Sequence, residues 1–559
     1  MAYSALVRMM IKSKSSIRGI ILLYFPFTFI FYIFKNRLCC FAQPVLSQIA
    51  VSFKKHTENR SFFTKSIVCI GIYFCHMLLV TVSKMCYTGV QTKSSAERIR
   101  IMAKRVDLLQ GNIMTTLVQL ALPIMGTALI QMAYNLVDMV WIGKLGSGAV
   151  AAVGTAGLLM WLSNGFTVLS RMGGQVHTAQ KLGAGDPEEA GKYAQNAIQM
   201  GALLSIGYSA VMLIACRPLI GFFRLNDPAV VESAVQYLSI VSLGILASFL
   251  NQMFTALITT TGNSRTPFYF MTIGLVFNIV LDPVLIFGLG PIPSMKAAGA
   301  AWATTIAQWL VSILFLLYIR RDDHLFCYVR LFGKMDKECC VSIVKLGLPS
   351  ALQNCIFPLI SMVIARQVAS FGDAAVAVQK VGSQIESVSW MISDGFSVAI
   401  NSFVAQNYGA HNFSRAGRGY RAAMISMTVW GIFCSLLLIL CGGWLFQLFI
   451  TEPDVVPMGI SYLTILGFSQ IFMCWEGVNT GAYCGFGKTL PPSIVGIVFT
   501  AARIPAALIL SSTSLGLDGI WWSLSISSVC KGTLLTLLFW RFLRHKLKEA
   551  PESLSQVTI

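Results

Sequence analysis

Charged residues are scarce in this chain, and acidic residues are the scarcest. Of 559 residues, 12% are charged and 55% are apolar, and 23 Asp and Glu stand against 42 Lys and Arg. Soluble domains carry roughly twice that charged fraction, so the composition excludes a water-soluble globular fold. The mean hydropathy of +0.70 indicates a membrane protein.

Signatures of enzymes and of nucleic-acid binding are also missing. The six histidines form no metal cluster, and the fifteen cysteines have neither metal-ligand nor disulfide spacing. No stretch matches the Gly-x-x-x-x-Gly-Lys-Ser/Thr pattern of an ATP-binding P-loop. No basic helix carries interleaved aromatic residues. We therefore expect no enzymatic activity, no cofactor, no nucleic-acid partner and no direct use of ATP.

Long apolar runs recur from near residue 115 to the C-terminus, each close to the ~20 residues that cross a bilayer as a helix. Glycine and proline inside them are compatible with helix, because neighbouring helices re-satisfy the freed backbone groups. The predicted fold class is an all-α polytopic membrane protein with twelve transmembrane helices, at about 115–142, 149–178, 190–217, 232–261, 268–290, 297–320, 341–370, 375–407, 416–448, 457–484, 490–512 and 516–544.

The chain contains an internal duplication. The loop signatures at 179–185 (Ala-Gln-Lys-Leu-Gly-Ala-Gly) and 405–411 (Ala-Gln-Asn-Tyr-Gly-Ala-His) lie 226 residues apart. The same offset relates Pro123 to Pro349, Gly146 to Gly372, and Gly191 to Gly417. A duplication of this length is typical of transporters built from two equivalent bundles. Six helices per half is an even number, so the two six-helix bundles are expected to be parallel repeats.

The first hundred residues differ from the duplicated body. Residues 1–106 hold sixteen Lys or Arg against two acidic residues, whereas the rest of the chain is almost neutral. Two further apolar segments, Ile20–Phe34 and Ile67–Val82, lack the cleavage pattern of a secretory signal. We expect an upstream extension without assigned function, with the functional chain starting at Met102; two accessory helices are the alternative. The predicted domains are the extension (1–106), an N-lobe (107–325), a cytoplasmic inter-lobe linker (326–340), a C-lobe (341–545) and a cytoplasmic tail (546–559).

Loop charges predict the orientation in the membrane. Basic residues gather in the connection at 320–337 and in the tail at 541–548, and such residues accumulate on the cytoplasmic side. Both termini of the body, and the loops that follow Gln180 and Gln406, are therefore expected in the cytoplasm. The predicted location is the inner membrane of the cell.

Intramembrane acids appear where the duplication fails. Asp138 falls opposite Ile364, and Asp282, aligned through the proline that follows it, falls opposite Ile504. A charged carboxylate at the bilayer centre costs at least ~2.5–3.5 kcal/mol. It is therefore retained only where it is neutralised, paired or next to water.

Amides accompany both acids. Asn135 precedes Asp138 by about one turn, and Asn278 shares a helix face with Asp282. Pro283 removes one helical hydrogen bond and is expected to kink the helix beside Asp282. Such a set of oxygens suits a proton relay or a small hard cation such as Na⁺. The alternative is that each acid merely bonds a neighbouring helix.

The second half has polar groups of its own, among them Glu386 and Asp394. Lys380 is six residues before Glu386, close enough for a salt bridge. A structural role and a functional role for this pair are equally compatible with the sequence.

Five motifs follow in a characteristic order: Leu122-Pro123, Asn135-Leu-Val-Asp138, Ile142-Gly-Lys-Leu-Gly146, the signature at 179–185, and Asn278-Ile-Val-Leu-Asp282-Pro283. In this order, over roughly residues 107–545, the chain resembles the multidrug and toxic compound extrusion (MATE) transporters. It is most similar to the prokaryotic branch that includes the DNA-damage-inducible protein F, whose cation site lies in the N-terminal lobe. The resemblance implies a monomer in the lipid bilayer that exports amphipathic, often cationic small molecules by antiport with H⁺ or Na⁺, through alternating access.

The resemblance also implies site residues. Asp138, Asn278 and Asp282, with Asn135 beside them and Thr304 on the sixth helix, would bind the coupling cation, and the first three would be the metal ligands if that cation is Na⁺. A further amide on the fourth helix would be Asn251 or Gln252. The expected substrate cavity is lined by Met160, Trp161, Gln252, Trp302, Phe357, Gln384 and Glu386.

One position departs from other branches of that family. They place a glutamate just before the Leu-Pro of the seventh helix, where this chain has Gly347. The C-lobe cation site of those branches is therefore in doubt, although Glu386 and Asp394 leave room for an auxiliary site.

Two rival functions share part of the pattern. A lipid-linked oligosaccharide flippase would have the same duplicated architecture, but it would line its cavity with several cations for a diphosphate. This body has few intramembrane cations beyond Arg366, Lys380 and Arg503. A polytopic membrane enzyme or receptor would need a catalytic constellation or a signalling domain, and neither is visible.

Overall fold

A computed structural model describes residues 105–549, apart from 224–226, 289–292, 332 and 451. The two upstream apolar segments lie outside the described residues. The first half comprises α7 (Ile113–Gly143), α8 (Ser147–Gly183), α9 (Pro187–Ile214), α10 (Cys216–Gly221), α11 (Pro228–Thr260), α12 (Arg265–Phe287) and α13 (Lys296–Ile319). After a 3-10 turn, η2 (Phe326–Tyr328), the second half comprises α14 (Lys337–Ala369), α15 (Asp373–Gly409), α16 (Phe413–Gln447), α17 (Val456–Gly467), α18 (Gln470–Gly485), α19 (Leu490–Ala501), α20 (Arg503–Ser511) and α21 (Leu517–Glu549).

These helices confirm the predicted all-α polytopic fold. Within the described residues, ten spans are long and apolar enough to cross a membrane, with α19 and α20 together forming one of them. The pair α17–α18, bent by 45°, makes an eleventh. The remaining predicted span is α15, which is 37 residues long but less apolar because it carries Lys380, Glu386 and Asp394. Each of the twelve predicted segments thus has a helical counterpart.

Caps and glycines set the helix boundaries. Asn112, Asp186 and Asp336 each accept a hydrogen bond from a backbone N–H in the first turn of α7, α9 and α14, which satisfies a donor that every helix start leaves unpaired. The helices α8 and α15 instead follow Gly146 and Gly372, whose φ angles of 105° and 101° favour glycine. The duplicated halves therefore share backbone geometry as well as sequence.

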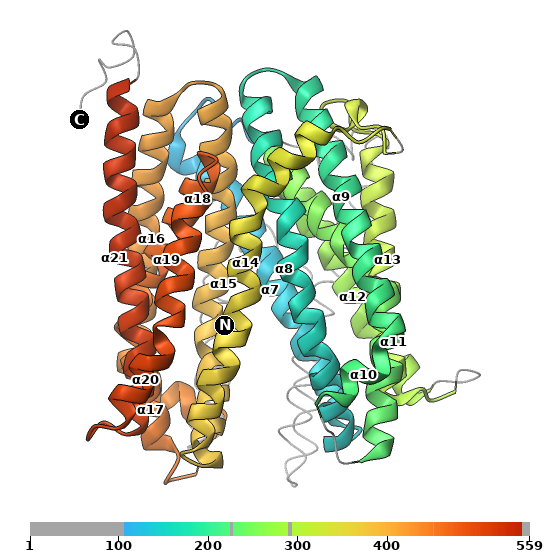
Figure 1. The fold of residues 1–559 in the computed structure, drawn as a ribbon, viewed down its shortest axis with the longest axis vertical. Coiled ribbons are helices and arrows are strands. Elements are labelled where there is room, and N and C mark those ends of the chain that lie inside the picture. The colour runs from blue at the N-terminus through green and yellow to red at the C-terminus, as the bar shows by residue number, and fades with distance from the viewer. Residues whose placement is uncertain (1–104, 224–226, 289–292, 332, 451, 550–559) are drawn as a thin grey trace, which may run out of the picture. The chain divides into compact units, whose positions relative to one another are not determined.

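Two helices, α7 and α14, each pack against both lobes, with one end in each. Leu117, near the start of α7, packs into a core built by α15, α16, α18 and α21, whereas Ile142 at its end packs into the core of the first lobe. Ile343 near the start of α14 does the reverse, and Val368 near its end joins a core of the second lobe. The most extensive helix pairing in the described chain joins α14 to α8 of the other half, and Figure 1 shows these two helices crossing.

The connection between the halves docks onto α9. Gln199 Nε2 donates to the carbonyl oxygens of Leu331 and Gly333 at 2.9 and 2.7 Å. The Asp336 N–H donates to Asn196 Oδ1 at 2.7 Å, and Lys192 Nζ lies 2.5 Å from Asp336 Oδ2. The Lys192 ammonium holds the pKa of Asp336 below its usual range. This connection is therefore anchored to the first lobe.

Candidate functional site

Asp138, Asn278, Asp282 and Thr304 meet inside the first lobe, on α7, α12 and α13. Thr304 Oγ1 donates to Asp138 Oδ2 at 3.2 Å, and Asn278 Nδ2 donates to Asp282 Oδ1 at 3.1 Å. Asp138 lies within side-chain hydrogen-bonding reach of both Asp282 and Asn278. Asn278 and Asp282 are fully buried, whereas Asp138 and Thr304 are half-buried. Three helices distant in sequence thus build one polar cluster.

Three oxygen atoms of this cluster are buried without a hydrogen-bond partner among the described residues: Asp138 Oδ1, Asn278 Oδ1 and Asp282 Oδ2. Leaving a buried acceptor unpaired costs ~1–3 kcal/mol. Neither carboxylate forms an ion pair with Lys or Arg in the described part of the chain. Carboxylate and amide oxygens in this arrangement suit a proton or a hard cation such as Na⁺.

Two tyrosines that the sequence analysis missed border this cluster. The Tyr134 hydroxyl lies beside Asp138, Asp282 and Thr304, and no described group meets it with hydrogen-bond geometry. Tyr237 on α11 lies beside both carboxylates. Tyr134 is one turn before Asp138 on the same helix face, so the sequence carried a signal for it. For Tyr237 no such signal existed.

Other residues predicted for the first lobe lie around this cluster rather than in it. Asn135 has an exposed side chain. The buried Asn251 donates to Gln308 Oε1 at 2.9 Å, whereas the half-buried Gln252 donates to Asn164 Oδ1 at 3.2 Å. Neither of the two candidate fourth-helix amides is hydrogen-bonded to the acids.

The helix α12 remains one helix through Pro283. The proline ring removes a single helical N–H, so the carbonyl of Ile279 loses that donor one turn away. The expected loosening of the backbone beside Asp282 is therefore confined to one hydrogen bond.

The second lobe has no acids at the positions equivalent to Asp138 and Asp282. Ile364, opposite Asp138, is 2% exposed. For the fifth helix of each half, two glycines reveal the register: a Cβ added at Gly299 would overlap the Leu285 carbonyl, and one added at Gly519 would overlap the Leu510 carbonyl. Leu285 and Leu510 therefore occupy equivalent places.

This register corrects the sequence alignment. Counting back from Leu285 and Leu510 places Ala507 opposite Asp282, and Arg503 opposite Asn278. The alignment that set Ile504 opposite Asp282 is wrong, because it matched Pro283 to Pro505. The second half breaks between α19 and α20, so its proline occupies a different turn of the helix.

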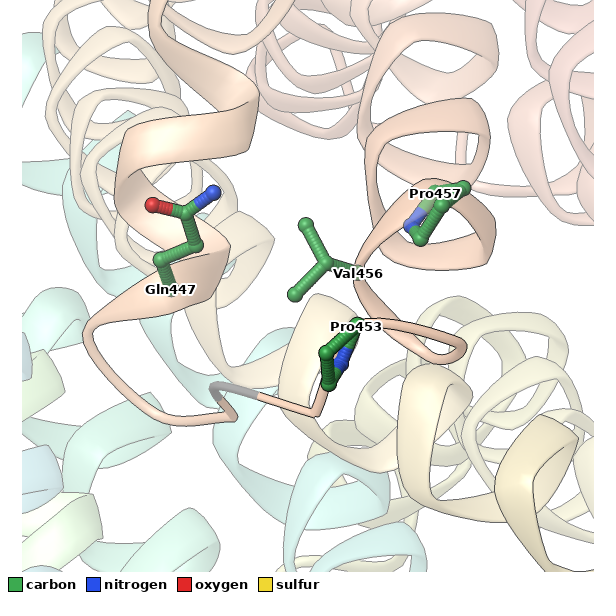
Figure 2. Close-up of a pocket in the computed structure, with 4 residues that line it drawn as sticks. All are labelled: Gln447, Pro453, Val456 and Pro457. Atoms are coloured by element: carbon green, nitrogen blue, oxygen red, sulfur yellow. The ribbon is translucent and has the colours of Figure 1, made fainter.

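Most of the predicted substrate-cavity residues carry exposed or half-buried side chains. Trp161, Trp302 and Phe357 are 47%, 37% and 39% exposed. Gln384 is exposed, and Met160 packs against the core of the first lobe. Within the described part of the chain, no hydrogen bond or ring contact joins any two of these five side chains, so their role as a substrate cavity stays a prediction. A hollow of about 420 Å³ lies at the start of α17, and none of the predicted cavity residues lines it. Figure 2 shows the four residues that do, Gln447, Pro453, Val456 and Pro457.

Glu386, also predicted for the cavity, belongs to a different environment. Its Oε1 accepts a hydrogen bond from Gln470 Nε2 at 3.3 Å, and Arg503 lies within Coulombic range. Lys380 is exposed, and the described chain contains no Lys380–Glu386 salt bridge. The predicted pairing is therefore wrong, because the six-residue spacing points the two side chains in different directions.

The duplicated loop signatures join the two lobes at one end. Gln180 Nε2 of the first lobe donates to the Gly485 carbonyl of the second at 2.9 Å. Gln406 Nε2 of the second lobe donates to the Thr260 carbonyl of the first at 2.5 Å. The two glutamines are equivalent in the repeat, and both acceptors end the fourth helix of their half. These hydrogen bonds are therefore related by the pseudo-symmetry of the molecule.

Glycines let the backbones approach at the same end. A Cβ on Gly183 would overlap the Gln406 carbonyl, and a Cβ on Gly409 would overlap the Gln180 carbonyl. Gln175 Nε2 donates to Ser402 Oγ at 3.2 Å in the buried interface beneath. This end of the inter-lobe space is closed in the structure.

Residues 105–111, which precede α7, contact both lobes at the same end. Arg105 forms an ion pair with Asp322 of the first lobe, and the Val106 N–H donates to the Gly262 carbonyl at 3.0 Å. Arg415 of the second lobe donates to three carbonyls of the segment, those of Leu108, Gln110 and Gly111. Residues 105–111 are thus held by both lobes.

Replacing either glutamine should weaken the contact between the lobes at the closed end. We expect Gln180→Ala and Gln406→Ala to increase the labelling rate of Cys484 by similar amounts, because each removes one inter-lobe hydrogen bond worth ~0.5–1.5 kcal/mol. Cys484 is fully buried at the lobe interface with Val176 and Leu346. Mass spectrometry after maleimide treatment measures the rate. Ser361→Ala, which removes a hydrogen bond within α14, is the control, and an equal effect of that variant would contradict the assignment.

Comparisons with known proteins agree with this architecture. The family model MatE matches residues 123–284 and 349–509, one segment in each half. The chain is 27% identical over 430 residues to the probable multidrug resistance protein NorM of Thermotoga maritima, covering 76% of this chain and 91% of that protein. It is 28% identical over 377 residues to the FAD transporter of Shewanella oneidensis, covering 65% and 80%. A crystal structure of MATE in the straight conformation has the same fold, with a TM-score of 0.73 and 24% identity over 80% of this chain and 99% of that one.

Proposed function

Because the chain belongs to the MatE family, we propose that it is a secondary active transporter that exports amphipathic small molecules in exchange for H⁺ or Na⁺. The observation that carries the proposal is the cluster of Asp138, Asn278 and Asp282. Among the described residues, three oxygens of this cluster have no hydrogen-bond partner and no Lys or Arg forms an ion pair with either acid. Binding a cation would stabilise such a cluster, because the cation would pair with oxygens that lack a partner. The binding free energy would change when α7, α12 and α13 repack, because their packing sets the distances between these oxygens. Those are the two requirements of a coupling site.

The closed end supports alternating access. Cation and substrate need only prefer opposite arrangements of the lobes for exchange to occur. With the predicted orientation, the end closed by Gln180 and Gln406 is the cytoplasmic end. Cation binding at Asp138 and Asp282 would tie α7, α12 and α13 together and favour release of the substrate. Parting of the Gln180 and Gln406 contacts would then return the cation to the cytoplasm.

We infer the substrate class from the names of two relatives and from the basic residues within the membrane-spanning helices. The name of the Thermotoga maritima relative supports multidrug export, whereas that of the Shewanella oneidensis relative names FAD. Arg503 and Lys531 are both engaged inside the second lobe, which leaves few cations to hold the diphosphate of a lipid-linked oligosaccharide. Export of amphipathic, often cationic compounds across the inner membrane is therefore preferred to a flippase.

Transport in proteoliposomes tests the proposal. We expect a fluorescent cationic dye to move against an imposed pH or Na⁺ gradient, because the cation that returns down its gradient supplies the driving force. The gradient that drives dye movement identifies the coupling ion. Vesicles with collapsed gradients are the control. Equal dye movement with and without both gradients would contradict secondary active transport.

A further inference from the structure

The second lobe contains buried charges that the coupling site does not use. Lys531 on α21 and Glu476 on α18 form an ion pair of 2.9 Å, with side chains only 6% and 17% exposed. Lys531 Nζ also lies 2.9 Å from the other carboxylate oxygen of Glu476. Removing charges from water is costly, so a buried pair is retained only with close partners.

Arg503 and Glu386 extend this pair into a cluster of four charges. The Arg503 guanidinium donates to Ser527 Oγ at 3.0 Å and to Ser528 Oγ at 3.1 Å. It lies within Coulombic range of Glu476 and Glu386, and Lys531 lies within range of Arg503 and Glu476. Two acids and two bases therefore share one region, and the cluster is neutral when all four are ionised.

The repeat places this cluster where the first lobe has its acids. The motifs Asp227-Pro228-Ala-Val-Val and Glu452-Pro453-Asp-Val-Val lead, with one common offset, to Tyr237 and Tyr462. Tyr237 lies beside Asp138 and Asp282, whereas Tyr462 lies beside Glu386 and Arg503. The equivalent tyrosine thus marks the equivalent place in both lobes.

The register of the fifth helices agrees. Arg503 occupies the position that corresponds to Asn278, as the equivalent approaches of Gly299 and Gly519 to their neighbours establish. Where the first lobe presents a neutral amide whose Oδ1 has no hydrogen-bond partner in the described part of the chain, the second lobe presents a guanidinium.

We propose that Arg503 and Lys531 are permanent counter-ions of Glu386 and Glu476. By neutralising these acids with side chains of the same protein, they restrict binding of the coupling cation to the first lobe. This inference deepens the proposed function and rests on it. A tethered ammonium or guanidinium satisfies Glu386 and Glu476 without exchange with either side of the membrane. A cation from solution gains little by entering, because the acids are already neutralised and Arg503 and Lys531 repel it.

Loss of a basic residue should change cation binding in the second lobe, where the acids have basic neighbours. Removing Lys531 leaves Glu476 buried with less compensation, and a buried carboxylate without a partner is costly. The lobe should then acquire what the first lobe already has, an acid that takes a proton or a monovalent cation from solution. Lys531 is in this sense a determinant of coupling specificity.

Purified protein in detergent provides the test, in a background of Asp138→Asn and Asp282→Asn that silences the first lobe. We expect the thermal unfolding midpoint of this background protein to be the same in Na⁺ and in choline. Adding Lys531→Met should make the midpoint rise when Na⁺ replaces choline or when the pH falls, because the folded state then binds a cation that the unfolded state does not. Lys531→Arg, which keeps the charge, and Lys531→Met with Glu476→Gln, which removes both charges, should restore insensitivity.

Two results would overturn the proposal. One is a background protein whose midpoint still responds to Na⁺, with the response abolished by Glu476→Gln, since the second lobe would then bind solution cations with its bases in place. The other is a Lys531→Met protein that responds no more than Lys531→Arg. If Lys531→Met does not fold, the background protein with and without Glu476→Gln still decides the matter. Failure of the proposed function would appear separately, as absence of gradient-driven transport by the unmodified protein.

Discussion

Asp138→Asn and Asp282→Asn are each expected to abolish gradient-driven export while leaving the protein folded. Asparagine keeps the volume of the side chain and removes the charge that a coupling cation neutralises. Because the two acids lie in one cluster with Asn278 and Thr304, the loss of either should reduce dye efflux to the level of vesicles without protein. Efflux from proteoliposomes measures the effect, and monodispersity in detergent shows that the fold is retained.

Comparison variants make this result specific. Asn278→Ala should weaken transport less, because it removes a neutral ligand rather than a charge. Glu386→Gln should be mild, because Glu386 belongs to the cluster of the second lobe, and Asp323→Asn, in the connection between the lobes, should have no effect. Normal export by both Asp variants, together with an inactive Glu386→Gln, would place the coupling site in the second lobe.

Gly183→Leu is expected to prevent the closed end from forming and to stop transport. A Cβ at Gly183 would overlap the backbone of Gln406. The larger side chain therefore fits only if the two lobes separate. The same substitution forces the Gln180 and Gln406 hydrogen bonds apart. We expect export to fall to the level of empty vesicles and Cys484 to become accessible to maleimide, because this buried thiol lies at the same interface.

A matched glycine lies on the same helix. Gly154, also on α8, has open space where its Cβ would be, so Gly154→Leu should leave export and Cys484 labelling unchanged. Gly409→Leu, the pseudo-symmetric counterpart of Gly183→Leu, should reproduce its effect. If Gly183→Leu exports normally with Cys484 still protected, the contact at this end is not part of the transport cycle.

Much of the fold was predictable because membrane insertion is a local property. Each apolar run of sufficient length forms a helix to satisfy its backbone in lipid, so the twelve segments follow from composition alone. The bend between α17 and α18 and the break between α19 and α20 did not follow. The segments on either side of each break are apolar in sequence, so hydropathy carries no signal for a change of helix direction. In the structure α17 and α18 pack against α16 and α21, whereas α19 and α20 pack against α14 and α21.

The candidate site was predictable in part. Asp138 and Asp282 stood out because a lone acid in an apolar run is costly, and Asn278 stood out by its spacing. Tyr237 carried no such mark, since a tyrosine near a helix end is ordinary. The error at Ile504 has the same origin, because a shared proline is a weaker guide to register than the helix contacts of Gly299 and Gly519.

The sequence by itself determined that the chain is a duplicated helical membrane protein with acids in its first half. Hydropathy, spacing and the repeat offset are all properties of residues close together along the chain or compared in one register. Only the tertiary structure decided which acids have a base beside them. Glu476 meets Lys531, which lies 55 positions further along the chain, while Asp138 and Asp282 meet each other and no base among the described residues, because ion pairing depends on distances between helices. That difference in neighbours, rather than the acids themselves, separates the coupling site from its counterpart.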